Sequence, residues 1–157
     1  MSRQSKKELI WELIHLARAH QAANDAFDEV AYQKLGINRT DGRCLDIVEN
    51  HGSMTAGRLA ELSGLTTAAV TAVLDRMERA GYARRVRDEH DRRQVIVELT
   101  PLAAERGRQI WGPLGADATA ELSRMSIAEL HAARDFFRRG REINERQLER
   151  LRKLSFD

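Results

Sequence analysis

The stretch LAELSGLTTAAVTAV (residues 59–73) has the spacing of two short helices joined by a tight turn. Ala60 lies where the first helix would pass close to the second, and Val70 lies on the inner face of the second helix. Gly64 supplies a turn residue that tolerates positive φ without steric cost. Thr66 is a suitable N-cap, because its hydroxyl can accept from a free N–H of the next turn. The sequence therefore predicts a helix-turn-helix.

The second of these helices is predicted to be amphipathic over residues 67–80. The side chains expected to point into the core recur at helical spacing: Val70, Val73, Leu74 and Met77. The opposite face begins with small and hydroxyl side chains, which would let the helix lie deep in a DNA major groove about 12 Å wide. The residues expected to contact bases or phosphates are Thr66, Thr67, Ala68, Thr71, Ala72 and Arg76. An ordinary surface helix is the alternative interpretation.

Two strands are predicted next, over residues 82–87 and 94–99. Side chains of a strand alternate between its two faces. Val95, Val97 and Leu99 share one face and are expected to lie against the core.

A polar turn joins the two strands, and residues 84–93 contain five arginines and three acidic residues. A basic loop beside such a helix fits the narrow minor groove, whose negative potential attracts inserted arginine. We expect Asp91 to accept from an arginine and to hold the loop in one shape. The loop residues expected to contact DNA are Arg87, Arg92 and Arg93. A solvated charged loop is the alternative.

Three sequence runs together resemble the MarR family of bacterial transcription regulators. They are LTTAAVTAVLDRMERAGY (residues 65–82), DEHDRR (residues 88–93) and LTP (residues 99–101). The resemblance covers about residues 40–103. Two departures from the family pattern bear on the dimer and ligand pocket: Ala103 replaces a common glycine, and WGP interrupts residues 111–113.

The resemblance implies a homodimeric winged-helix repressor that binds a pseudo-palindromic operator. A small phenolic or otherwise lipophilic ligand, or oxidation, often lowers the DNA affinity of such proteins. Carried over by motif, Thr71 and its neighbours would contact bases and phosphates, and Arg93 would enter the minor groove. A winged helix used only for protein contacts is a further alternative, against which the arginines at positions 92 and 93 count.

The N-terminal segment predicts one helix of about 29 residues, which at 1.5 Å per residue would be about 43 Å long. Ser5 and Glu8 form a capping box at its start. After the strands, Pro101 is placed to begin another helix. The Gly112–Pro113 pair is expected to kink or break this helix, because proline lacks a backbone donor and clashes with the preceding turn. Ser126 opens a last long helix with a second capping box.

These elements predict a mainly α fold with a small β-wing, in which long terminal helices flank a winged helix-turn-helix. The predicted segments are a dimerisation helix over 1–36, a DNA-binding domain over 37–100 and dimerisation helices over 101–157. Helices too long for one small domain are expected to interlock with those of a second copy as a twofold dimer. Packing as a hairpin within one chain is the alternative.

The chain has 157 residues, of which 42% are hydrophobic, enough for one core. It lacks an apolar run of about 18 residues and a signal-peptide pattern, so we expect a cytoplasmic protein without a membrane partner. The net charge of +2 is too small by itself to indicate nucleic-acid binding. The histidines and carboxylates lack metal-ligand spacing and no phosphate-binding glycine motif is present, so we predict neither an enzyme nor a cofactor.

Four residues are candidates for an effector pocket: Trp11, His15, Cys44 and Trp111. The more common role of such residues is to pack in a core or dimer interface. Cys44 is the only cysteine, which excludes an internal disulfide. It would sense peroxide if it were exposed and its thiolate were stabilised by a neighbour such as Arg43. A buried structural thiol is the favoured interpretation.

Overall fold

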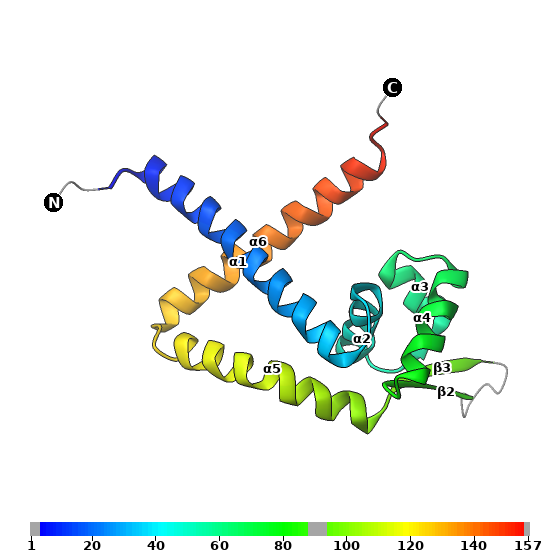
Figure 1. Ribbon diagram of the computed structural model, residues 1–157. Helices are drawn as coiled ribbons and strands as arrows, with labels where there is room; N and C mark the ends of the chain where they lie inside the picture. Colours follow the sequence, from blue (N-terminus) through cyan, green and yellow to red (C-terminus); the bar gives the residue numbers. More distant parts are fainter. Residues whose placement is uncertain (1–3, 88–93, 156–157) are drawn as a thin grey trace. The chain divides into compact units, whose positions relative to one another are not determined.

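The computed structural model describes residues 4–87 and 94–155. By contacts the chain divides into two units, residues 1–110 and 111–157. The elements follow in the order α1 (Lys6–Leu35), α2 (Arg39–His51), β1 (Met54–Thr55), α3 (Ala56–Ser63), α4 (Thr67–Arg79), β2 (Ala83–Arg87), β3 (Val95–Leu99), α5 (Pro101–Leu122) and α6 (Ile127–Arg152) (Figure 1). Within the described residues, none of the helices combines the length and apolar content that crossing a membrane requires.

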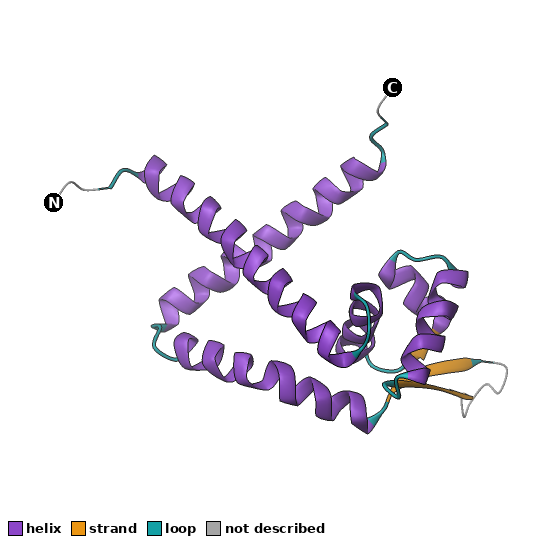
Figure 2. Ribbon diagram, in the orientation of Figure 1, coloured by secondary structure: helices purple, strands orange, loops and turns teal. Residues whose placement is uncertain are grey.

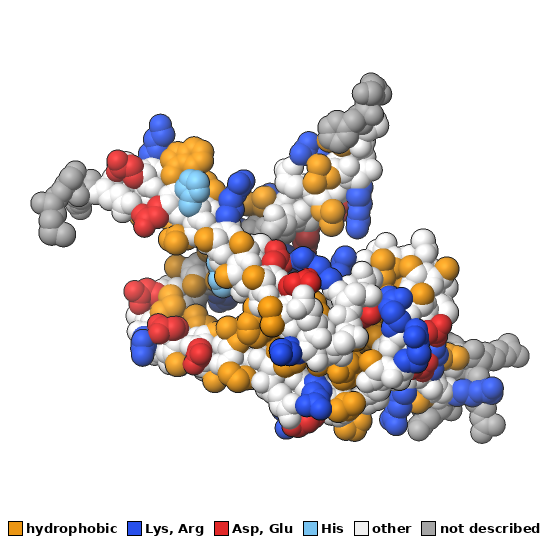
Figure 3. Space-filling view, in the orientation of Figure 1, with side chains coloured by type: hydrophobic (Ala, Val, Ile, Leu, Met, Phe, Trp, Pro, Cys, Tyr) orange, Lys and Arg blue, Asp and Glu red, His pale blue; other side chains and the backbone are white. Residues whose placement is uncertain are grey.

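The first helix, α1, is 30 residues long, which confirms the predicted long N-terminal helix. The Ser5 hydroxyl accepts from the Glu8 N–H at 3.2 Å, and the Glu8 carboxylate accepts from the Ser5 N–H at 2.7 Å. Gly36 ends the helix in the left-handed conformation with φ 69°. Large apolar side chains remain exposed along α1: Leu9, Ile10, Trp11, Leu13, Ile14, Leu16, Phe27 and Val30. Figure 3 shows orange side chains along this helix.

The core of the first unit lies between α2, α3, α4 and the sheet. The apolar stripe predicted for the second helix of the motif is confirmed, because four side chains of α4 are at most 1% exposed: Val70, Val73, Leu74 and Met77. Leu59 of α3 and Val97 of β3 are also fully buried against them. Burial of this stripe fixes which face of α4 remains open to solvent.

The turn between α3 and α4 has the predicted chemistry. Gly64 ends α3 with φ 71° and donates its N–H to the Ala60 carbonyl at 2.9 Å. The Thr66 hydroxyl accepts from the Ala69 N–H at 3.2 Å and caps α4. The helix-turn-helix is therefore confirmed.

The sheet has three antiparallel strands in the order β1-β3-β2. The predicted pair is β2 and β3, in register from Ala83–Leu99 to Arg87–Val95. The two-residue β1, which was not predicted, pairs with β3 through Met54–Val97 and Thr55–Ile96. Val97 is buried as predicted, but the prediction for Val95 is wrong: it is 45% exposed. Val95 lies opposite Arg87, at the end of the hairpin that projects beyond the helices in Figure 2.

Of the kink or break expected at Gly112 and Pro113, the break does not occur, because α5 continues through Pro113 to Leu122. A proline removes a single N–H donor, here the one that would reach the carbonyl of Gln109, and its fixed φ is itself helical. The loss of one hydrogen bond does not end a helix whose flanking residues continue it. In the second unit, the Ser126 capping box that begins α6 is confirmed.

Candidate nucleic-acid interface

The solvent-facing side of α4 carries the small residues that the sequence assigned to DNA contact. Five of them are exposed: Thr66, Thr67, Ala68, Thr71 and Ala72. The Thr71 hydroxyl donates to the Thr67 carbonyl at 3.0 Å, so its oxygen lone pairs remain available to accept from a ligand. No charged side chain precedes Asp75 on this helix. The first two turns of α4 therefore present a narrow face that can approach another surface closely.

Arg85 of β2 connects the hairpin to α4. Its guanidinium donates to the Asp75 carboxylate at 2.8 Å, to the Thr71 carbonyl at 3.2 Å and to the Glu78 carboxylate. The Arg85 backbone N–H also donates to Glu78, at 2.8 Å. Several bonds between one strand and one helix hold the base of the hairpin in a fixed position beside α4.

Arg76 has an intramolecular partner that was not predicted. Its Nε donates to both carboxylate oxygens of Asp41, at 3.1 and 3.0 Å, and a terminal nitrogen donates at 2.6 Å. Asp41 belongs to α2 and is 1% exposed, whereas the Arg76 side chain remains 37% exposed. The hydrogen bonds to Asp41 raise the pKa of Arg76. Arg76 therefore ties α4 to the first turn of α2.

The remaining wing residues divide between the described and the masked parts of the chain. Arg87 is exposed at the end of β2, and Arg84 pairs with Glu98 of β3 at 2.9 Å. The predictions for Asp91, Arg92 and Arg93 fall outside the described residues. Arg87 is thus the one predicted DNA-contacting residue of the wing that lies in the described part of the chain, and it is exposed.

The candidate effector residues are not gathered in one place within the first unit. Trp11 and His15 are neighbours on α1, with ring centroids 6.5 Å apart, and Trp11 is 56% exposed. Cys44 lies in the core of the winged region, beyond the other end of α1. Trp11 and Leu35 are 24 positions apart on α1, which corresponds to about 36 Å of helix. Trp111, at the start of the second unit, is partly buried.

Cys44 is completely buried, as the structural interpretation predicted. Burial raises the pKa of the Cys44 thiol, and the Asp41 carboxylate raises it further. Arg43 and Arg76 act in the opposite direction but do not reverse the shift. The thiolate that reacts with peroxide is therefore disfavoured at this position.

We expect iodoacetamide to alkylate Cys44 at least about a hundredfold more slowly in the folded protein than in urea, because both the accessibility and the thiolate fraction are low. Mass spectrometry after timed quenching measures the two rates. The urea-unfolded protein is the control for intrinsic reactivity. Equal rates in the two states would contradict a structural role for this thiol.

Among the residues that the structure describes, no group of three histidine, cysteine or carboxylate side chains is arranged to hold a metal ion.

Comparison with known proteins places the chain among transcription regulators. The family model that matches is that of the MarR family, over residues 37–95. The HTH-type transcriptional regulator YcgE of Bacillus subtilis is 36% identical over 152 residues, covering 96% of this chain and 98% of that protein.

Solved structures show the same fold. RV1404 from Mycobacterium tuberculosis has a TM-score of 0.67 and 22% identity, covering 90% of this chain and 96% of its own. NadR in complex with 4-hydroxyphenylacetate has a TM-score of 0.58 and 22% identity, covering 88% and 96%.

Proposed function

The chain belongs to the MarR family of transcriptional regulators, and we propose that it acts as a homodimer that represses transcription from a pseudo-palindromic operator. The observation that carries this proposal is the exposed small-residue face of α4 beside a hairpin that Arg85 holds in place. A helix with such a face suits the major groove, and a fixed basic hairpin suits the neighbouring minor groove.

In the proposed complex the first turns of α4 lie in the major groove. The residues proposed to contact base edges or nearby phosphates are Thr66, Thr67, Ala68, Thr71 and Ala72. The Thr71 hydroxyl acts there as an acceptor, since its proton is used within the helix. Arg76 reaches a phosphate only through the part of its side chain that Asp41 leaves exposed, so its main contribution is to position α4.

The wing is proposed to enter the adjacent minor groove through Arg87, Arg92 and Arg93, with Asp91 holding the loop. In the described part of this hairpin, Arg84 and Arg85 are engaged by Glu98, Asp75 and Glu78. Those two arginines are therefore assigned to the structure of the wing rather than to DNA contact.

Replacement of Arg93 by alanine is expected to weaken duplex binding about tenfold, because a loss of about 1–3 kcal/mol is typical for one specific arginine contact. Fluorescence anisotropy with an operator recovered by selection from random DNA measures the affinity and its salt dependence. Arg146→Ala on α6 is the charge-matched control and leaves both unchanged. An unchanged affinity and salt slope in Arg93→Ala would remove the wing from the interface.

Dimerisation is supported by apolar surface that one chain leaves uncovered. The α1 helix exposes a row of large aliphatic side chains, and α6 separately exposes another set: Ile127, Phe136, Phe137, Ile143, Leu148 and Leu151. Soluble proteins normally cover apolar surface of this extent. A twofold dimer would place two α4 helices in successive major grooves about 34–36 Å apart.

Selection of bound sequences tests the proposal as a whole, because a dimeric reader returns inverted half-sites one helical turn apart. If the dimer neutralises about eight phosphates, log affinity falls against log salt with a slope near −7. Recovery of unrelated sequences, or no binding by the folded protein, would contradict the proposal.

The repressor is further proposed to release DNA when a small phenolic or lipophilic ligand binds. NadR was solved with 4-hydroxyphenylacetate, a phenolic acid. Trp11 and His15 are exposed together on α1 and supply an aromatic and a polar group to such a site. Cys44 is buried in the core of the winged region and does not lie beside these two side chains. We therefore place the proposed ligand site of Trp11 and His15 at the dimer interface. Calorimetry with phenolic acids, before and after Trp11→Ala, tests this site.

A further inference from the structure

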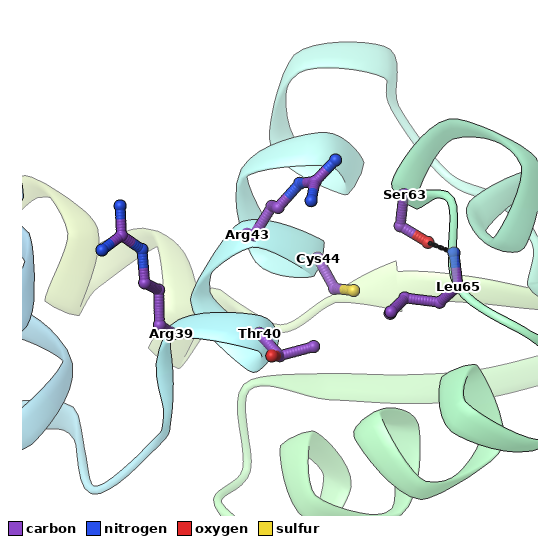
Figure 4. Close-up of a pocket in the computed structure, with 6 residues that line it drawn as sticks. All are labelled: Arg39, Thr40, Arg43, Cys44, Ser63 and Leu65. Carbon is purple, nitrogen blue, oxygen red and sulfur yellow. Dashed lines mark hydrogen bonds between the residues drawn. The ribbon is translucent and has the colours of Figure 1, made fainter. Parts of the chain in front are cut away.

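A cavity of about 190 Å³ lies between the first turns of α2 and the turn that joins α3 to α4 (Figure 4). It opens to solvent, and two segments distant in sequence line it: Arg39, Thr40, Arg43, Cys44, Ser63 and Leu65. One water occupies about 30 Å³, whereas pockets for drug-sized ligands measure about 300–1,000 Å³. The cavity therefore has room for a small polar group and is too small for most drug-sized ligands.

Of the two arginines that line the cavity, only Arg43 is available to bind a ligand there. Figure 4 shows Arg39 pointing away from the cavity, and its guanidinium pairs with Asp25 at 2.6 Å. The Ser63 hydroxyl donates to the Ala60 carbonyl at 3.3 Å and accepts from the Leu65 N–H at 3.4 Å. Among the residues that the structure describes, no carboxylate pairs with Arg43, which is exposed at the rim.

Several other arginines of the winged region have carboxylate partners within the described residues. Arg58 pairs with Glu61 at 2.8 Å and Arg84 pairs with Glu98 at 2.9 Å. Arg76 and Arg85 are engaged by carboxylates of their own unit. Arg43 is therefore a cation at a cavity whose charge the described part of the chain does not neutralise, so an anion is the occupant that the site favours.

The position of the cavity identifies the source of that anion. Leu65, in its wall, immediately precedes Thr66, the N-cap of α4. When the first turns of α4 lie in a major groove, the phosphates along the edge of that groove pass beside this end of the helix. The cavity also lies beside the N-terminal turn of α2, the positive end of the helix dipole.

We propose that this cavity holds one backbone phosphate of the bound duplex, with Arg43 as its counter-charge. The site rests on the proposed DNA-binding function and extends the interface to α2, outside the helix-turn-helix and the wing. Its contact is with a phosphodiester, so it contributes affinity and orientation but no sequence preference. In a dimer the site occurs twice, once for each half-site.

Arg43→Gln tests the site because it removes the charge at an exposed position and leaves the buried core untouched. We expect the affinity for a selected operator duplex to fall about three- to tenfold. The slope of log affinity against log salt is expected to become less negative by about 1.8, which is about 0.9 for each of the two phosphate contacts that the dimer loses. The affinity for a mixed-sequence duplex falls by the same factor. Arg43→Lys restores most of the slope, and Arg146→Gln leaves it unchanged.

Phosphate ethylation interference locates the contact. We expect ethylation of one phosphate per half-site to weaken binding of the wild-type protein. Ethylation of the same phosphate is expected to have no effect on binding of Arg43→Gln. An unchanged slope and an unchanged ethylation pattern in Arg43→Gln, with wild-type protein binding normally, would overturn this site alone. Failure of the wild-type protein to bind any duplex would instead overturn the proposed function together with this site.

Discussion

Asp41→Asn is expected to lower the free energy of unfolding by about 2–3 kcal/mol, because it leaves the Arg76 guanidinium beside a neutral group inside the fold. Asp41 is 1% exposed and holds Arg76 through two donor nitrogens, the shortest contact being 2.6 Å. Loss of one partner from a fully buried pair costs about 3–5 kcal/mol, and we reduce this range because 37% of the Arg76 side chain is exposed.

Urea unfolding followed by circular dichroism measures the change, at one fixed protein concentration because the proposed dimerisation would add to stability. Asp25→Asn is the matched control. It removes a carboxylate from the Arg39 pair, whose side chains are 69% and 39% exposed, and such pairs contribute about 0–1 kcal/mol. Equal losses in the two variants would show that the Asp41 pair is no stronger than a surface pair.

A double variant separates the pair from the helix cap that Asp41 also forms with Asn38. Arg76→Gln added to Asp41→Asn is expected to cost much less than the sum of the two single changes, since the pair is already broken. Additive losses would assign the effect of Asp41→Asn to the cap.

Gly42→Ala is expected to destabilise the protein by about 2–3 kcal/mol through overpacking between α1 and α2. A Cβ atom at Gly42 would overlap the ring of Tyr32, whose backbone lies on α1 and whose side chain is buried. Relief requires the ring to move and to break the hydrogen bond from the Tyr32 hydroxyl to Asp46, 3.4 Å long. The gain in helix propensity, about 1 kcal/mol, is smaller than this cost.

Gly107→Ala on α5 is the matched control, because nothing lies within 4 Å of a Cβ atom at that position. The same substitution there is expected to stabilise the protein by about 0.5–1 kcal/mol. Opposite signs for one chemical change would isolate the contact with Tyr32. Similar effects at both glycines would contradict close packing at Gly42.

A spectroscopic readout accompanies the Gly42→Ala stability measurement. Burial, together with the Asp46 and Asp28 carboxylates, raises the pKa of Tyr32 to about 12. Displacement of the ring by Gly42→Ala is expected to lower this pKa toward its ordinary value of 10.0. Absorbance titration at alkaline pH follows the ionisation in the wild-type protein and in Gly42→Ala.

Local patterns in the sequence were sufficient for the starts of α1, α4 and α6 and for the face of α4 that stays exposed. Capping boxes at Ser5 and Ser126 and the glycine turn at position 64 act over three or four residues, so their spacing is visible in the chain. The α4 stripe likewise repeats at the helical period. These features required no knowledge of distant contacts.

The missed features depend on partners far along the chain. Strand β1 has two residues and exists only because β3 pairs with it, so no alternation precedes it in the sequence. Arg76 and Asp41 are separated by 35 residues, and an arginine on an amphipathic helix gives no sign of such a partner. Arg85 was counted among the cations of the wing, yet the fold turns it toward Asp75 and Glu78. The free Arg43 could be recognised only after these pairs were known.

The position of β3 between β1 and β2 has a consequence for how such regulators diverge. Both arms of the hairpin are anchored outside residues 88–93: β3 is bonded on its two sides, and β2 is held by Arg85. Mutations between Arg87 and Gln94, including insertions and deletions, therefore leave intact the hydrogen bonds that pair the strands and those that hold Arg85 to α4. Evolution can alter the loop proposed to contact the operator while the rest of the domain is inherited unchanged.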